Sequence, residues 1–227
     1  MKLRLLVNNM LPALLVLCSA SVARAHVFNT WSFNAAIPDG TGGGLAIPLN
    51  VTSEFNSISQ LSVSLSIKGE YNGDLYAYIT HGSGYAVLLN RVGSTVANPY
   101  GYGDPGLYVT FADMASDIHN YRLTLNGNQT QPLGVALTGI WAPDGRATSP
   151  ESVSDTDART ATLSSFDGVD PNGSWTLYVA DMSPGGTHTL VGFGLSDNSV
   201  QAVPEPSMYM LFGLGLTGWF FWRKRCA

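Results

Sequence analysis

Apolar and polar residues alternate along much of the middle of the chain. The clearest case is segment 61–67, LSVSLSI, in which serines separate the apolar residues. This period of two places one face of a strand against a core and the other face in water. Segments 175–179 and 189–195 repeat the pattern. We therefore predict strands in these three segments.

Five further segments show a less regular form of the same pattern. These strands are expected at 45–51, 75–80, 86–90, 107–111 and 135–141. Clusters of Gly, Asn, Asp and Pro separate them, such as GDPG at 103–106 and DPNG at 170–173, and such clusters favour turns. No segment between the chain ends shows convincing helical periodicity. The pattern predicts an all-β domain, a jelly-roll-like β-sandwich, with a closed barrel as the alternative.

The N-terminal end differs in kind from this middle part. Two basic residues precede an apolar stretch at 11–17, and Ala23 and Ala25 supply small residues at the positions that a signal peptidase reads. We therefore expect residues 1–25 to be a signal peptide that is removed after Ala25.

The C-terminal end combines a short motif, an apolar run and a basic stop. The motif is Pro204, Glu205 and Pro206, the run extends over 208–222, and the stop is Arg223, Lys224 and Arg225. About fifteen helical residues span roughly 22 Å, which is less than the roughly 30 Å of a bilayer's hydrocarbon core. The basic stop is expected on the cytoplasmic side. Such a segment could be removed after export. The alternatives are an ordinary single-pass anchor and a buried C-terminal helix.

In this order, motif, apolar run and basic stop resemble the PEP-CTERM sorting signal of Gram-negative bacteria that make exopolysaccharide. The resemblance implies that 204–227 is a sorting signal with a hydrophobic transmembrane helix, after a linker at 198–203. It implies that an exosortase, a membrane transpeptidase, removes the tail of an exported protein. The precursor would be anchored transiently in the inner membrane, and the mature protein would reach the cell surface or the extracellular matrix.

Without its two ends the chain is strongly acidic. Residues 26–203 contain five basic side chains against fifteen acidic ones, a net charge of −10, compared with −5 for the full sequence. Such a domain repels the phosphates of nucleic acids, so we expect no nucleic-acid partner. Neither cysteine lies within this span, so an intramolecular disulfide is not available to it.

Two stretches carry a second resemblance. The first has Gly-Asp-Leu at 73–75, and the second has Phe-Asp-Gly at 166–168 followed by Asn-Gly-Ser-Trp-Thr-Leu-Tyr-Val-Ala-Asp at 172–181. Together they resemble the P domain, or Homo B domain, of proprotein convertases and bacterial subtilisin-like proteases. The resemblance implies that 26–197 is one jelly-roll β-sandwich without catalysis of its own. Phe193 departs from the tryptophan that this family commonly has there.

No residue is assigned a catalytic role. His81 and Ser83 are two positions apart in an expected hairpin turn, and a Gly-x-Ser-x-Gly segment does not occur. The histidines also lack the spacing of a zinc site. We therefore expect that the protein is not an enzyme.

Asp74 and Asp181 are the candidates for a metal site. Both match acidic positions of the P-domain motif at expected strand ends. A calcium ion or a backbone cap could each explain a carboxylate there, so calcium is the one cofactor that we carry forward. The loop at 170–173 lacks the first ligand and the closing Glu of an EF-hand, which favours a plain turn.

Three functions remain open for the sandwich, and a noncatalytic structural or interaction module is the one that we predict. The second is a carbohydrate-binding module for exopolysaccharide, and the third is an accessory P domain that works with a separate subtilisin-like protease. Expected partners are signal peptidase and the exosortase for processing, and exopolysaccharide or a surface protein afterwards. Aromatic candidates for stacking on sugars are Trp31, Tyr100, Tyr102, Tyr108 and Trp141.

Overall fold

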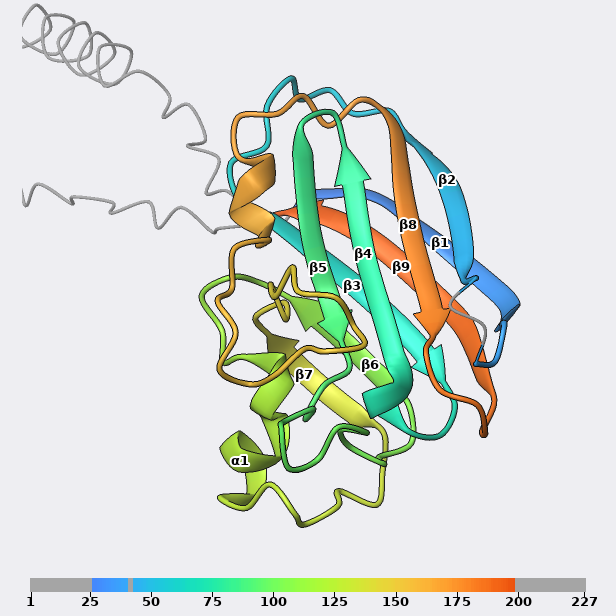
Figure 1. The fold of residues 1–227 in the computed structure, drawn as a ribbon. Coiled ribbons are helices and arrows are strands. Elements are labelled where there is room, and N and C mark those ends of the chain that lie inside the picture. Colours follow the sequence, from blue (N-terminus) through green and yellow to red (C-terminus); the bar gives the residue numbers. More distant parts are fainter. Residues whose placement is uncertain (1–25, 41–42, 199–227) are drawn as a thin grey trace, which may run out of the picture. The chain divides into compact units, whose positions relative to one another are not determined.

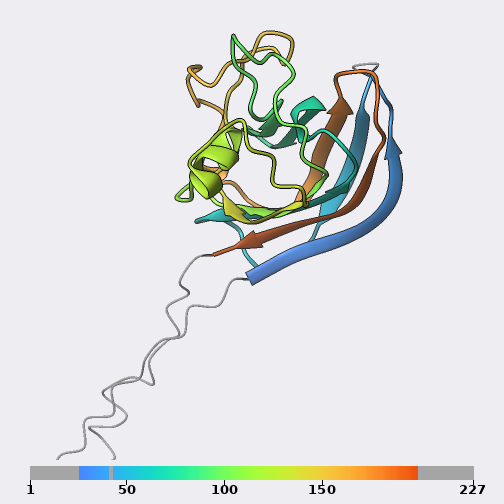
Figure 2. The ribbon, with the colours of Figure 1, turned by 90° about the horizontal axis from the view of Figure 1, so that it is seen from below.

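The predicted strands form two β-sheets that enclose one hydrophobic core (Figure 1, Figure 2). The computed structural model describes residues 26–40 and 43–198. The signal peptide expected at 1–25 and the sorting signal expected at 204–227 lie outside the described residues. Within the described ranges, we find no helix that is both long and apolar enough to cross a membrane.

The larger sheet has five strands in the order β1-β9-β3-β6-β7. Strands β6 and β7 are parallel, whereas the other neighbours are antiparallel. On β3, Val63, Leu65 and Ile67 face the core with no exposed surface, while Ser64 and Ser66 lie on the other face and are only partly buried. The strands are β1 (His26–Ile37), β3 (Leu61–Lys68), β6 (Leu107–Phe111), β7 (Leu137–Trp141) and β9 (His188–Asp197).

The smaller sheet has four antiparallel strands in the order β2-β8-β4-β5. Strand β4 shows how the sequence pattern becomes two faces, because Leu75, Ala77 and Ile79 are buried in the core and Tyr76 and Tyr78 are half-buried on the outer side. The strands are β2 (Leu45–Val51), β4 (Leu75–His81), β5 (Gly84–Asn90) and β8 (Gly173–Asp181).

All eight predicted strands are present, so the all-β prediction is confirmed, and the bounds of β2 and β6 agree with the predicted 45–51 and 107–111. The closed-barrel alternative is wrong, because the strands divide into two separate sheets. The jelly-roll arrangement stays a prediction.

Strand β1 was not predicted. It pairs with β9 along its length, with register shifts after Val27 and after Ser32. Across the first shift the inward side chains change from the even position of Phe28 to the odd positions of Trp31 and Phe33. A β-bulge of this kind interrupts the period of two, which is why the alternation was not visible in the sequence.

The described part of the chain also contains one short α-helix. Helix α1 (Tyr121–Asn126) has six residues, too few for a helical period to be visible in the sequence, and it ends at Gly127 with φ 65° in the left-handed conformation that closes helices. Three 3-10 turns are η1 (Asn72–Asp74), η2 (Ile118–Asn120) and η3 (Leu163–Phe166).

The first prediction concerns the core between the sheets. Leu65 is fully buried in the middle strand of the larger sheet, so Leu65→Ala should lower the free energy of unfolding by about 2–5 kcal/mol through lost burial and a cavity. Urea unfolding measures this change. The control is Val135→Ala, whose side chain is 65% exposed and whose effect should stay below about 0.5 kcal/mol. Equal effects of the two substitutions would contradict the placement of the core.

Candidate functional site

The two calcium candidates, Asp74 and Asp181, are brought together by the fold. Asp74 is the last residue of η1, and the next residue, Leu75, pairs with Asp181 at the end of β8. Both residues are buried, with exposures of 7% and 0%. The fold therefore places side by side two carboxylates that are far apart in the sequence.

Each of these carboxylates has a cationic or ionisable neighbour. Arg91 Nη2 lies 3.6 Å from Asp74 Oδ1, and it donates a hydrogen bond to Ser183 Oγ at 2.7 Å. His188 Nδ1 lies 2.7 Å from Asp181 Oδ2. Burial raises the pKa of Asp74, and it outweighs the opposing hydrogen bond with Ser183. We call these four side chains, Asp74, Arg91, Asp181 and His188, the strand-end cluster.

A calcium ion in the strand-end cluster would compete with Arg91 and His188 for the same carboxylates. In the part of the chain that the structure describes, no group of three or more His, Cys, Asp or Glu side chains is arranged to hold a metal ion. Calcium binding by Asp74 and Asp181 stays a prediction.

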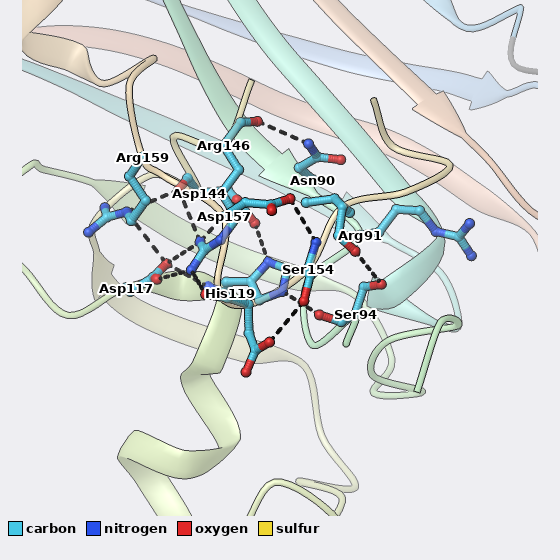
Figure 3. A network of polar contacts seen from close by, with 12 residues as sticks. Asn90, Arg91, Ser94, Asp117, His119, Asp144, Arg146, Ser154, Asp157 and Arg159 are labelled. Carbon is cyan, nitrogen blue, oxygen red and sulfur yellow. Dashed lines mark hydrogen bonds and ion pairs between the residues drawn. The ribbon is translucent and has the colours of Figure 1, made fainter. Parts of the chain in front are cut away.

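A second polar network, which the sequence did not indicate, surrounds η2 (Figure 3). His119 Nδ1 lies 2.7 Å from Asp144 Oδ2, and its Nε2 lies 2.9 Å from the backbone oxygen of Ser94. Burial lowers the pKa of His119, but the hydrogen bond and the charge of Asp144 more than offset this, so the pKa is raised. The doubly protonated ring can donate to both oxygens at once.

Two arginines connect this network to its surroundings. Arg146 Nη1 lies 3.2 Å from Asp144 Oδ1, its Nη2 lies 2.9 Å from Asp117 Oδ2, and Arg159 Nε lies 3.9 Å from Asp117 Oδ1. The backbone nitrogen of Asp144 also donates to Leu88 of β5 at 3.1 Å. The network therefore joins η2 and the segment after β7 to β5. Strands β7 and β5 are edge strands of the larger and the smaller sheet (Figure 1).

This network contains a serine, a histidine and an aspartate, but their geometry is not that of a catalytic triad. The nitrogen of His119 faces the backbone oxygen of Ser94, while the hydroxyl of Ser94 donates to the backbone oxygen of Val153 at 3.0 Å. A general base has to reach the proton of its nucleophile. The arrangement instead connects three loop segments.

His81, which the sequence analysis weighed against Ser83, is also bound on both sides of its ring. Its nitrogens lie 2.9 Å and 2.6 Å from the backbone oxygens of Ser174 and Asp170. The ring stacks on Trp175 with centroids 4.3 Å apart. Ser83 is exposed in the turn between β4 and β5. Both nitrogens of His81 therefore serve to position the loop at 170–174.

The loop at 170–173 is a turn held by its own side chains. Asp170 Oδ1 accepts hydrogen bonds from the backbone nitrogen of Asn172 at 2.9 Å and from its Nδ2 at 2.8 Å. Asn172 Oδ1 in turn accepts from the backbone nitrogen of Ser53 at 2.6 Å. These contacts are those of an Asx turn.

The aromatic residues weighed for sugar binding are dispersed over the fold. Tyr102 and Trp141 are core residues, with exposures of 2% and 4%, and Trp31 packs against the core. Tyr100 is exposed in a loop, and Tyr108 is exposed on β6. The five rings are therefore not one sugar-binding surface.

Four other tyrosines gather on the outer face of the smaller sheet, namely Tyr76, Tyr78, Tyr85 and Tyr178, and we call them the tyrosine cluster. Their grouping was not predicted from the sequence. A signal was available, because Tyr76 and Tyr78 alternate with residues expected in the core, but their partners on β5 and β8 depend on the strand order.

A cleft of about 530 Å³ lies near the end of the sandwich where β9 ends. Asp113 is fixed at its wall, because its carboxylate accepts hydrogen bonds from the backbone nitrogens of Leu163 at 3.0 Å and Ser164 at 2.7 Å. Burial raises the pKa of Asp167, and the charges of Asp113 and Asp197 act in the same direction. The cleft is lined by Ser59, Gln60, Leu61, Asp113, Met114, Leu163, Ser164 and Asp167.

Comparison with known proteins bears on the C-terminal end. Residues 202–225 match the family model of the PEP-CTERM protein-sorting motif. The chain carries a PEP-CTERM sorting signal. The matched range includes Pro204, Glu205 and Pro206, and the motif indicates an exported, membrane-passing precursor that an exosortase sorts in a Gram-negative bacterium.

Among solved structures, the serine protease of Aeromonas sobria matches with a TM-score of 0.36 and 11% identity, over 77% of this chain and 27% of that chain. Its complex with the chaperone ORF2 matches with a TM-score of 0.38 and 12% identity, over 76% of this chain and 26% of that chain. This chain thus spans about a quarter of the length of these chains. No curated protein matches it significantly. The P-domain resemblance stays a prediction.

The second prediction concerns the pH dependence of the network around η2. Since the pKa of His119 is raised above its ordinary 6.5, the protonated ring stabilises the fold fully below that pH, and this contribution is lost as the pH rises through the folded-state pKa. The difference in unfolding free energy between the unmodified protein and His119→Gln should therefore shrink above pH 6.5.

Urea titrations from about pH 5.5 to about pH 9 measure this difference. The control is Lys68→Gln, which changes an exposed side chain on β3 and should show a flat difference over the same range. A difference for His119→Gln that stays constant with pH would show that folding does not shift the pKa of His119, and it would contradict the prediction.

Proposed function

We propose that the protein is a noncatalytic module of the cell surface or extracellular matrix, to which an exosortase delivers it. The observation that carries the proposal is the PEP-CTERM motif at 202–225. Signal peptidase and the exosortase are its processing partners, and the inner membrane holds the precursor only transiently. Exopolysaccharide or a surface protein is the class of partner that the mature module would contact.

The state of the histidines supports a noncatalytic role. His81, His119 and His188 each have both ring nitrogens within hydrogen-bond distance of a backbone or carboxylate oxygen. A general base needs a nitrogen that can accept a proton from the substrate or its nucleophile. These rings instead fix loops at the edges of the sandwich.

The buried carboxylate of Asp104 likewise has its hydrogen-bond partners within the protein. Asp104 Oδ2 accepts hydrogen bonds from the Tyr121 hydroxyl at 2.7 Å and from Arg122 Nε at 2.6 Å, and its Oδ1 accepts from the backbone nitrogen of Leu133 at 2.7 Å. Burial acts to raise the pKa of Asp104, but these hydrogen bonds and the charge of Arg122 lower it. Asp104 is thereby held as a carboxylate that anchors α1 and the loop before β7.

The jelly-roll arrangement is part of the same proposal. The antiparallel pairs β1–β9, β2–β8, β3–β6 and β4–β5 are nested within one another, as in a long hairpin wound into two sheets. Strand β7 is an addition to this scheme, parallel to β6. An accessory P domain beside a separate protease is the second candidate function, favoured by the motif residues Asp74 just before β4 and Asp181 at the end of β8.

The third prediction concerns processing at both ends. In a host with its exosortase, the mature protein should begin near His26 and lack the apolar tail, and intact-mass analysis of the surface fraction measures both losses. Replacing Pro204 and Pro206 with Ala should leave the tail attached and the protein in the membrane. An intact tail on the mature surface protein would contradict sorting by an exosortase.

The fourth prediction concerns catalysis. The mature protein should hydrolyse neither peptides nor esters, because His81, His119 and His188 are bound to other groups. Release of chromophore from peptide and ester substrates measures turnover, with Ser83→Ala as the matched variant. Turnover that is present in the unmodified protein and absent in Ser83→Ala would show that the protein is an enzyme.

A further inference from the structure

The tyrosine cluster occupies the outer face of the smaller sheet, which Figure 1 shows facing the viewer. Tyr78 of β4 and Tyr178 of β8 are cross-strand partners, and their rings stack with centroids 4.8 Å apart at an angle of 18°. The ring centroids of Tyr76 and Tyr78 are 5.8 Å apart, and those of Tyr78 and Tyr85, which lies on β5, are 5.5 Å apart. The cluster therefore covers three neighbouring strands.

The rings of the cluster project from the sheet. Neighbouring strands are about 4.8 Å apart, so two cross-strand rings that stack at this distance stand beside one another and do not lie flat on the strands. The hydroxyls of Tyr76 and Tyr85 are 3.2 Å apart, and the Tyr178 hydroxyl accepts a hydrogen bond from the backbone nitrogen of Gly44 at 3.0 Å. The cluster offers apolar ring edges together with hydroxyl groups.

This face is uncharged although the domain is strongly acidic. The other outward residues beside the cluster are uncharged, namely Ala46, Pro48, Thr80 and Thr176, together with Val87 and Ala180, which are fully buried. Burial raises the pKa values of Tyr76 and Tyr78, so their phenol groups stay neutral at physiological pH. Neutral hydroxyls can both donate and accept hydrogen bonds, but they carry no net charge that would select a charged ligand.

We propose that the tyrosine cluster is a docking surface for a neutral polysaccharide chain. Sugar rings present hydroxyl groups and C–H groups together, which matches the hydroxyls and apolar edges of the tyrosines. Anionic polymers are disfavoured by the net charge of −10 carried by residues 26–203, and a cationic chain finds no carboxylate among the outward residues named above. An extended chain fits a surface that follows the sheet across three strands.

The proposal deepens the surface-module function and rests on it only for the location of the protein. Cross-strand aromatic pairs also stabilise a sheet. A test therefore has to separate binding from stability, and Tyr108 offers a matched control because it is an exposed tyrosine on the larger sheet.

The test is affinity electrophoresis of the mature protein in native gels that contain dextran, galactomannan or laminarin, with alginate as an anionic comparison. We expect at least one neutral polysaccharide to retard the protein and alginate to leave its mobility unchanged. Tyr78→Ala should weaken the retardation at least about tenfold, as the loss of a central contact does in binding surfaces. Tyr108→Ala should bind as the unmodified protein does.

Thermal melting of each variant distinguishes a loss of binding in a folded protein from a loss of binding caused by unfolding. If Tyr78→Ala does not fold, Tyr78→Phe takes its place, because it keeps the stacked ring and removes only the hydroxyl, and it should also weaken retardation. The proposal is overturned if no neutral polysaccharide retards the protein, if alginate alone does so, or if the Tyr78 variants bind normally.

Sedimentation at several concentrations tests whether a second copy of the chain, instead of a polysaccharide, occupies this face. A dimer that Tyr78→Ala dissociates would make a second copy of the chain the occupant and would overturn the proposal, whereas a monomer in both supports it. None of these results affects the sorting function, which loss of the tail tests separately.

Discussion

Each strand of this sandwich has to bury one face and leave the other in contact with water. The packing of the two sheets against each other depends on this constraint. The inward residues of β3 and β4, such as Leu65 and Ile79, have almost no exposed surface. The outward residues are consequently free to differ between the sheets. Serines occupy alternate positions of β3 in the larger sheet, whereas tyrosines occupy those of β4 in the smaller one.

The arginines show how an acidic domain of this kind fixes its loops. Four of the five basic side chains in the described chain, Arg91, Arg122, Arg146 and Arg159, lie within 4 Å of an aspartate carboxylate. The pairs made by Arg91, Arg122 and Arg146 are largely buried, so salt screens them less than exposed pairs. Removal of one partner would leave an uncompensated buried charge, which typically costs about 3–5 kcal/mol.

The sequence was sufficient for eight of the nine described strands but not for the contacts between distant segments. A period of two identified β3 and β8 directly, whereas the bulges of β1 concealed a strand of twelve residues. Asp74 and Asp181 were recognised one by one as strand-end residues, and the fold brought them together. Nothing in the spacing of His119 and Asp144 indicated their pairing, because it depends on how two loops meet beside β5. Prediction of the tyrosine cluster would have required both the period of two and the strand order.

The pairing of the first described strand with the last has a consequence for how an exported chain acquires its structure. Strand β9 lies between β1 and β3, so the larger sheet stays open along its middle until β9 is in place. A chain that crosses a membrane from its N-terminus delivers β9 last, and such long-range pairing is intrinsically slow. The sorting motif begins at residue 202, soon after β9 ends at Asp197. For a chain that crosses unfolded, closure of the sheet becomes possible only when translocation has nearly reached the sorting signal, and the order of secretion then also sets the order of folding.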